Sequence, residues 1–277
     1  MSTGQNQDLT IFKDNSLLSD AILSSESSLL STITYVQGTS PQWLINSLIE
    51  NALQGTAALV NNDLNQKIRN RSEVEFVSFL HPLDYYVKNC KKNGLDLTHS
   101  PGFTFIDYFS QLFTENIKDT TSSKKEISKM FDDITKKLKI SNNKKKVVFI
   151  ELPEVLLQAT DFTSDGLLAE ILKVNRLCRQ LFIISAKDHI KSFNLDSSIP
   201  QDPVFKTTDF LVKLFHRSHY NISLSPLSTG RASDITGSLT ISKGSLPVDS
   251  VVDRLVINEK EYIYHITKDS NIRLFFR

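Results

Sequence analysis

The chain has 277 residues, of which 40% are hydrophobic and 23% are charged, and its 32 Lys and Arg residues almost balance its 31 Asp and Glu residues. A net charge of +1 excludes a uniformly basic nucleic-acid-binding protein but leaves room for a local basic patch. Two cysteines, Cys90 and Cys178, are too few for a disulfide framework or a zinc site. The longest apolar runs are strand-sized, far short of the roughly 20 residues of a membrane-spanning helix. These features predict a protein of the cytoplasm, and also of the nucleus, without a targeting or membrane segment.

Between residues 29 and 185, short apolar runs alternate with segments of helical periodicity. The runs are rich in β-forming residues and predict strands over residues 29–36, 74–80, 103–106, 146–151 and 181–185. Helices are predicted from Pro41 with Ser40 as N-cap, from Pro82 to a left-handed Gly94, over 108–117, after a Ser123–Glu126 capping box, and over 164–179. This alternation is typical of a parallel sheet that helices cover on both faces.

The last third of the chain has a different pattern. From Asp209 onward, apolar runs separated by turn residues predict strands over 210–218, 220–224, 237–242, 255–257, 261–267 and 272–276. The simplest architecture is an α/β fold whose mostly parallel sheet is flanked by helices and extended at its C-terminal edge by antiparallel strands. No linker divides the chain, so we expect one domain over residues 1–277, with an N-terminal extension over 1–28 and antiparallel strands over 209–277.

The first strand, loop and helix lie where a phosphate-binding loop would be. Such a loop needs the pattern GxxxxGK[ST], because its backbone N–H groups surround the phosphates and its lysine neutralises them. Residues 37–43 (QGTSPQW) contain one glycine and no lysine, and Pro41 removes an N–H that would point at a phosphate. The sequence favours an ordinary capped helix, with weak anion binding at Thr39 and Ser40 as the alternative.

Few other residues form a recognisable catalytic or metal-binding pattern. Glu151 ends an apolar strand, at the place of a metal-coordinating acid in a phosphate-loop nucleotidase, and Glu154 follows three residues later. Without a lysine and a hydroxyl partner, an acid at a strand end is the simpler interpretation. His216 and His219 would point to opposite faces of the expected strand, which argues against a metal pair. We therefore predict no catalytic residue, no metal and no cofactor.

The basic residues are more informative. Residues 118–146 contain ten lysines and four acids, a pattern for which a solvated helix face is the favoured explanation. Lys187 and Lys191 follow the strand over 181–185 and so lie at the carboxyl edge of the sheet, where α/β folds bind ligands. Arg231 lies in a polar loop over 228–234, from which a guanidinium can reach a nucleic-acid backbone. These three residues are the candidate nucleic-acid contacts.

Several short motifs follow one another in a characteristic order. They are Gln7-Asp8-Leu9 with Phe12 and Asp14, Pro41-x-Trp43-x-Ile45-Asn46-x-Leu48-x-Glu50, Ile150-Glu151-x-Pro153-Glu154, Leu224-x-Pro226-Leu227-x-Thr229-Gly230, Asp234-Ile235-Thr236-Gly237-Ser238-Leu239 and Leu274-Phe275-Phe276-Arg277. In this order and spacing the chain resembles the family of Elongator complex subunit six, most like its fungal members, over nearly its full length.

The resemblance implies a RecA-like domain without Walker motifs, in agreement with the missing lysine. It implies assembly with Elongator subunits four and five into a six-membered accessory ring holding two copies of each, together with the core Elongator subunits. That ring serves the modification of the wobble uridine of transfer RNA, and ATP binding and hydrolysis belong to the assembled ring. The ring members contact transfer RNA through loops lining the central opening, and the loop containing Arg231 matches one stretch between two late strands.

Two other functions remain open from the residues. The chain could be a divergent ATPase subunit that uses Glu151 across an interface with ligands from a neighbour, or a RecA-like adaptor of another assembly such as a recombination complex. The late aromatic residues also leave two interpretations, since head-to-tail ring contacts and internal packing would both use them. They are Phe210, Phe215, Tyr262, Tyr264, Phe275 and Phe276.

Overall fold

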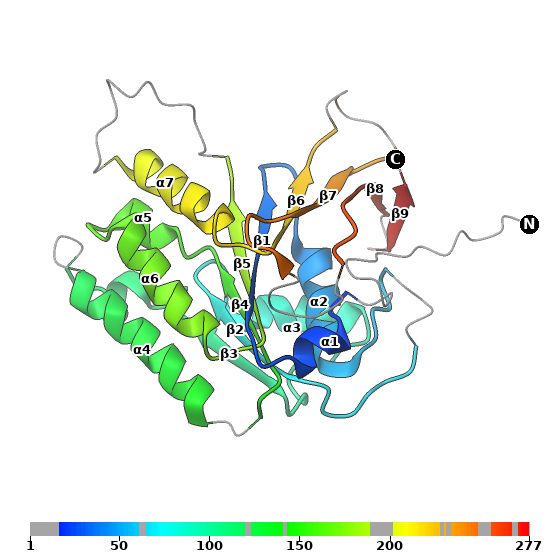
Figure 1. Cartoon of the computed structure of the whole chain (residues 1–277), viewed down its shortest axis with the longest axis horizontal. Coiled ribbons are helices and arrows are strands. Elements are labelled where there is room, and N and C mark those ends of the chain that lie inside the picture. The colour runs from blue at the N-terminus through cyan, green and yellow to red at the C-terminus, as the bar shows by residue number, and fades with distance from the viewer. Residues whose placement is uncertain are drawn as a thin grey trace, which may run out of the picture.

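The computed structural model describes residues 17–60, 65–119, 123–140, 143–188, 202–227, 230, 234–248, 256–267 and 271–276. Its strands make one nine-stranded sheet with the order β3-β2-β4-β5-β1-β6-β7-β8-β9 (Figure 1). They are β1 Leu29–Tyr35, β2 Glu73–Ser78, β3 Phe103–Asp107, β4 Lys146–Glu151, β5 Gln180–Ala186, β6 Tyr220–Ser225, β7 Gly237–Lys243, β8 Lys260–Ile266 and β9 Ile272–Phe276. The strands from β3 to β6 in this order run parallel, and β7, β8 and β9 are antiparallel.

Helices cover both faces of the parallel part of the sheet (Figure 1). On one face lie α1 Asp20–Ser24, α2 Gln42–Gln54 and α3 Leu83–Lys92, and on the other α4 Lys124–Ile140, α5 Val155–Ala159, α6 Ser164–Asn175 and α7 Pro203–Phe215. Successive β4 residues alternate between the two cores: Val147 and Phe149 pack with the first set, and Val148 and Ile150 with the second. Burial on both faces explains why the central strands are continuous apolar runs.

The strands predicted between residues 29 and 185 are all present, with small shifts at their ends. Helix α3 ends as expected, with Gly94 in the left-handed region at φ 81°. The helix predicted over 108–117 is wrong in extent, because only a π-helical turn, Leu112–Asn116, forms there. Likewise, α6 ends at Asn175 and not at 179.

The predicted strand over 210–218 is wrong, because these residues belong to α7 and the chain that follows it. Phe210, Leu211 and Leu214 form a helical face that is buried in the second core. A continuous apolar run fits the periodicity of a helix as well as that of a strand. The sequence signal that favours the helix is Asp202 as N-cap, followed by Pro203. In addition, β6 runs parallel to β1, so the antiparallel region begins at β7 and not at residue 209.

The start of α4 is also held differently from the expected capping box. Both the backbone N–H and the hydroxyl of Ser123 donate to the Asp161 carboxylate, at 3.1 and 2.5 Å. Glu126 instead accepts a hydrogen bond from the backbone N–H of Lys118. The helix therefore begins at the predicted place, but contacts distant in sequence hold its first turn.

The late aromatic residues are mostly internal. Tyr262 and Tyr264 are buried in the first core and Phe210 in the second, with Phe215 packed partly against it. Phe275 on β9 is 39% exposed, so it remains available for a partner.

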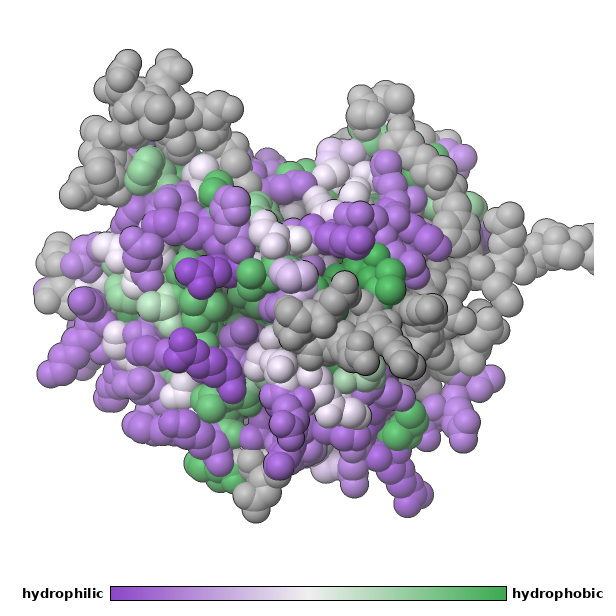
Figure 2. Space-filling model, in the orientation of Figure 1, coloured by the Kyte–Doolittle hydropathy of each residue, from purple (hydrophilic) through white to green (hydrophobic). Residues whose placement is uncertain are grey.

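Hydrophilic residues dominate the face seen in Figure 2, with hydrophobic ones scattered between them. Among the described residues, no helix is both long and apolar enough to cross a membrane.

Candidate functional site at the carboxyl edge of the sheet

The loop between β1 and α2 is a tight turn that uses its own polar groups. The Thr39 hydroxyl donates to the Val36 carbonyl at 2.7 Å and accepts from the Val36 N–H at 3.2 Å. Gly38 lies between them at φ 88°, a left-handed conformation that glycine adopts without strain. The Ser40 hydroxyl accepts from the N–H of Gln42, where α2 begins after Pro41. The N-cap residue is therefore Pro41 and not Ser40 as predicted, and the helix begins one position later than expected, at Gln42.

The segment after β5 closes over this turn. The Lys187 N–H donates to the Tyr35 carbonyl at 2.8 Å, which extends the pairing of β5 with β1. The next residue, Asp188, accepts a hydrogen bond of 2.7 Å from the N–H of Gln37. A carboxylate of the chain itself therefore binds a backbone amide of this loop, the kind of group with which a phosphate-binding loop holds its anion.

Glu151 ends β4 at the same edge and is almost fully buried. Its carboxylate accepts hydrogen bonds from the hydroxyls of Ser78, at 2.8 Å, and Tyr86. Burial raises the pKa of Glu151 to about 7, although these two hydrogen bonds act in the opposite direction. The acid that the sequence placed at a strand end therefore lies inside a network of neutral hydroxyls.

Glu154 is fully buried beside it. The carboxylate accepts from the Ala186 N–H at 2.8 Å and from the Ser185 hydroxyl at 3.0 Å. Burial raises its pKa to about 7 as well. Between the two acids Leu152 has a left-handed backbone, φ 53°, which turns the chain so that both side chains point inward. Glu151 connects the end of β4 to the end of β2 and to α3, and Glu154, just before α5, connects the start of that helix to the end of β5.

Lys187 is the one nucleic-acid candidate that the described residues include, since Lys191 and Arg231 lie outside them. Its ammonium donates to the hydroxyls of Ser223 and Ser225 on β6. Partial burial lowers its pKa, and the nearby Asp188 acts in the opposite direction. Two of the three ammonium donors are therefore used within the chain.

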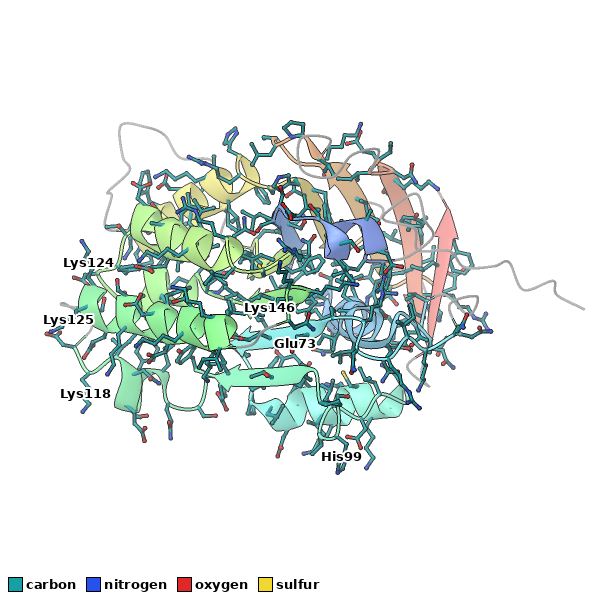
Figure 3. The ribbon with its side chains drawn as sticks, turned by 60° about the horizontal axis from the view of Figure 1, so that its bottom comes forward. Glu73, His99, Lys118, Lys124, Lys125 and Lys146 are labelled. Atoms are coloured by element: carbon teal, nitrogen blue, oxygen red, sulfur yellow. The ribbon has the colours of Figure 1, made fainter. Side chains whose placement is uncertain are left out.

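The lysine-rich segment does not form one continuous surface. Lys118, Lys124 and Lys125 lie together near the start of α4, far from Lys146 at the start of β4 (Figure 3). Lys146 is buried and donates to the carbonyl of Leu138. The other α4 lysines are exposed along the helix, as expected for a solvated face.

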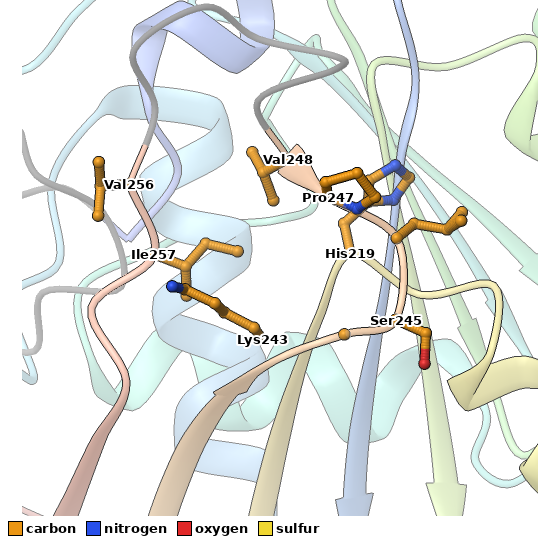
Figure 4. A pocket seen from close by; sticks show the side chains of 9 residues that line it. His219, Lys243, Ser245, Pro247, Val248, Val256 and Ile257 are labelled. Carbon is orange, nitrogen blue, oxygen red and sulfur yellow. The ribbon is translucent and has the colours of Figure 1, made fainter.

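The two neighbouring histidines, His216 and His219, do not pair. His216 caps α7, and His219 is buried before β6, where its Nδ1 lies 3.1 Å from the Leu30 N–H. The Leu30 carbonyl already accepts from the His219 N–H, so Nδ1 is best placed as the acceptor for Leu30. His219 lines a largely apolar cavity of about 430 Å³ with Lys243 and Pro247 (Figure 4). Nowhere in the described part of the chain do three His, Cys, Asp or Glu side chains converge as metal ligands.

Sequence reasoning missed the partners of the acids. Ser78 and Ser185 lie at the ends of β2 and β5, and Tyr86 lies on α3. A polar residue at the end of each parallel strand was the available signal, because those ends meet at one edge. Asp188 gave no such signal, since its role depends on a contact between two loops that are far apart in the sequence, the one after β5 and the one after β1.

Comparison with known proteins identifies the family. The chain is 30% identical over 285 residues, covering all of both chains, to Elongator complex protein 6 of Saccharomyces cerevisiae. The crystal structure of flagellar accessory protein FlaH from Methanocaldococcus jannaschii is similar, with a TM-score of 0.58 at 12% identity, over 98% of this chain and 99% of that one. A KaiC-like protein of Pyrococcus horikoshii has a TM-score of 0.48 at 9% identity, over 91% and 90% of the two chains.

No protein-family model matches the chain. The likeness to FlaH shows the fold, which is RecA-like: a mostly parallel sheet flanked by helices, with antiparallel strands added at its C-terminal edge. The yeast relative is similar over its whole length, so the identity is not confined to a shared fold motif. The chain therefore belongs to the family of Elongator complex protein 6.

Proposed function

We propose that the chain is a non-catalytic subunit of the Elongator accessory ring, where it supports the binding and release of transfer RNA during wobble-uridine modification. The observation that carries this proposal is the similarity to the yeast Elongator protein over all of both chains. Its partners in the ring are Elongator subunits four and five, and the ring acts with the core subunits in the cytoplasm and the nucleus.

The geometry of the carboxyl edge supports a non-catalytic role. The loop between β1 and α2 bonds to its own Thr39 and to Asp188, which adds negative charge where a nucleotide would need positive charge. Glu151 and Glu154 are buried and hydrogen-bonded to the chain, so neither is poised to hold a solvated metal ion. ATP hydrolysis in this proposal belongs to the assembled ring, and this chain needs no cofactor.

RNA contact from this chain is proposed for Lys187, Lys191 and Arg231. Lys187 keeps one ammonium donor beyond those given to Ser223 and Ser225, and it lies at the edge where α/β sheets bind ligands. A single remaining donor makes Lys187 a supporting contact, with loops reaching farther from the sheet as the main ones.

The experiment is native mass spectrometry of the endogenous complex, purified through a tag on this chain. A species with two copies each of three related proteins is expected. A monomer, or a complex with unrelated partners such as recombination proteins, would contradict the proposed assembly and favour a RecA-like adaptor.

A further inference from the structure

A second cavity lies at the opposite edge of the sheet, where β2 and β3 begin. It has a volume of about 540 Å³, in the range of small-ligand sites. The end of α2, the loop before β2 and the chain before β3 surround it. Its lining residues are Leu53, Gln54, Lys67, Ile68, Arg69, Asn70, Ser72, Ser100, Pro101 and Gly102. Two of them are cations and none is acidic.

Arg71, in the same loop, anchors the structure without lining the cavity. Its buried guanidinium donates to the carbonyls of Leu18 and Asn51, at 2.6 and 2.5 Å, and to the Asp20 carboxylate at 2.8 Å. The Ser72 hydroxyl donates to the carbonyl of Ala52 at 2.6 Å. The last carbonyls of α2 thus have donors, and the cation of Arg71 compensates the negative end of the helix.

Lys67 and Arg69 are left with a different role. Both side chains are exposed, and neither forms a hydrogen bond or an ion pair with any residue that the structure describes. Asn70, at φ 51°, turns the chain between these cations and the anchored Arg71. Because Arg71 already balances Asp20 and the helix end, no charge among the described residues pairs with the two cations at the cavity.

The rest of the cavity offers apolar walls. The Ile68 N–H donates to the Gln54 carbonyl at 2.8 Å, which fixes the loop to α2 while the Ile68 side chain stays 45% exposed. Leu53 and Pro101 supply apolar surface on the other sides. A pocket with two cations at its rim and apolar walls suits a ligand in which an anionic group is attached to an apolar or planar group.

We propose that this pocket binds a phosphate ester, with Lys67 and Arg69 holding the phosphate and Ile68 and Pro101 contacting the attached body. The planar guanidinium of Arg69 can form two parallel hydrogen bonds to phosphate oxygens, and Lys67 adds a second charge. The ester is either a free nucleotide or part of a nucleic-acid strand. The inference rests on this pocket and not on membership of a ring.

The test uses the full-length chain with labelled isoleucine methyl groups, followed by NMR. The probes are uridine 5′-monophosphate and a short single-stranded RNA, with uridine as the control that lacks phosphate. The Ile68 methyl signal should shift and saturate with a phosphate-bearing probe, while Ile140, 79% exposed on α4, stays unchanged. Lys67→Ala and Arg69→Ala should each weaken binding about tenfold, since each removes a charge-assisted hydrogen bond. Lys139→Ala, a matched exposed lysine on α4, should leave it unchanged.

The outcomes separate the two sources of phosphate. Saturation by the nucleotide supports a free ligand, and saturation by the strand alone supports a nucleic-acid site. An equal response to uridine, undiminished binding in the Lys67→Ala/Arg69→Ala double variant, or no Ile68 shift with either probe overturns the proposal. Because both substituted residues are exposed and have no partner among the described residues, the variants should fold normally, which circular dichroism verifies.

Discussion

The Asp188 carboxylate accepts a hydrogen bond of 2.7 Å from the backbone N–H of Gln37. Gln37 is the second residue after β1, and Asp188 follows β5, the neighbouring strand. The contact places a negative charge of the chain at the loop that would otherwise face a nucleotide. It therefore connects the position of the loop to the proposed non-catalytic role.

Replacing this carboxylate tests that connection. Asp188→Asn should lower the free energy of unfolding by no more than about 0.5–1 kcal/mol, because the hydrogen bond is solvent-exposed. It should not create ATP binding, since the loop still has no lysine to neutralise phosphates. Urea unfolding and ATP titration by calorimetry measure the two effects. Asp132→Asn, an exposed acid on α4, is the control, and ATP binding that appears only in Asp188→Asn would contradict a non-catalytic subunit.

The buried acids predict that stability falls as pH rises. Burial raises the pKa of Glu151 and of Glu154 from 4.5 to about 7. Between these values the folded chain binds more protons than the unfolded chain, so the free energy of unfolding decreases with pH. This contribution to the free energy of unfolding is complete below about pH 4.5 and is lost as pH rises through about 7. Each unit of difference between the folded and the unfolded pKa corresponds to about 1.4 kcal/mol. Urea unfolding between about pH 5 and pH 8 measures the slope.

Glu151→Gln isolates the contribution of one acid. An amide keeps the shape and an acceptor for Tyr86 but does not titrate, so the variant should show a flatter dependence of stability on pH. The assembled ring should hydrolyse ATP at the same rate with this variant, because the proposed role of Glu151 is structural. An unchanged pH slope would refute the assigned pKa shift. Loss of ring ATPase activity with intact assembly would instead favour the divergent ATPase alternative.

The donor to Glu151 can be removed separately. Tyr86→Phe should lower the free energy of unfolding by about 1–2 kcal/mol, because it deletes a hydrogen bond to a buried carboxylate. Tyr85→Phe is the matched control, since no hydrogen bond of its phenol is formed with the described residues. Equal effects in the two variants would show that the hydroxyl of Tyr86 adds nothing.

The helix α7 also has a direct test, because a strand and a helix bury different residues. A strand would place Phe210, Val212 and Leu214 on one face, whereas in the helix Leu214 is buried and Val212 is 45% exposed. Leu214→Ala should cost about 2–5 kcal/mol and Val212→Ala within about 0.5 kcal/mol. Similar losses in both variants, measured by urea unfolding, would indicate the strand.

These residues show what could be predicted from the sequence. The β4 run VVFI is buried on both faces, so composition alone identifies it as a central strand. The run FLVKLF in α7 is compatible with either a helix or a strand, because both kinds of element bury short apolar segments. The partners of Glu151 and Glu154 come from three separate elements, β2, α3 and β5, and the sequence pattern within one element carries no information about contacts between elements.

The proposed contact with transfer RNA predicts a strong dependence on salt. Phosphate contacts release counterions, so the affinity of the assembled ring for RNA should fall linearly in a plot of log affinity against log salt. Arg231→Ala should reduce that slope by about one if its guanidinium contacts a phosphate. Lys187→Ala should reduce it by less, because Ser223 and Ser225 already hold two donors of its ammonium. Lys129→Ala, on the exposed face of α4, is the charge-matched control. A flat response to salt would exclude backbone contact, and an equal loss in all three variants would indicate general charge in place of a defined site.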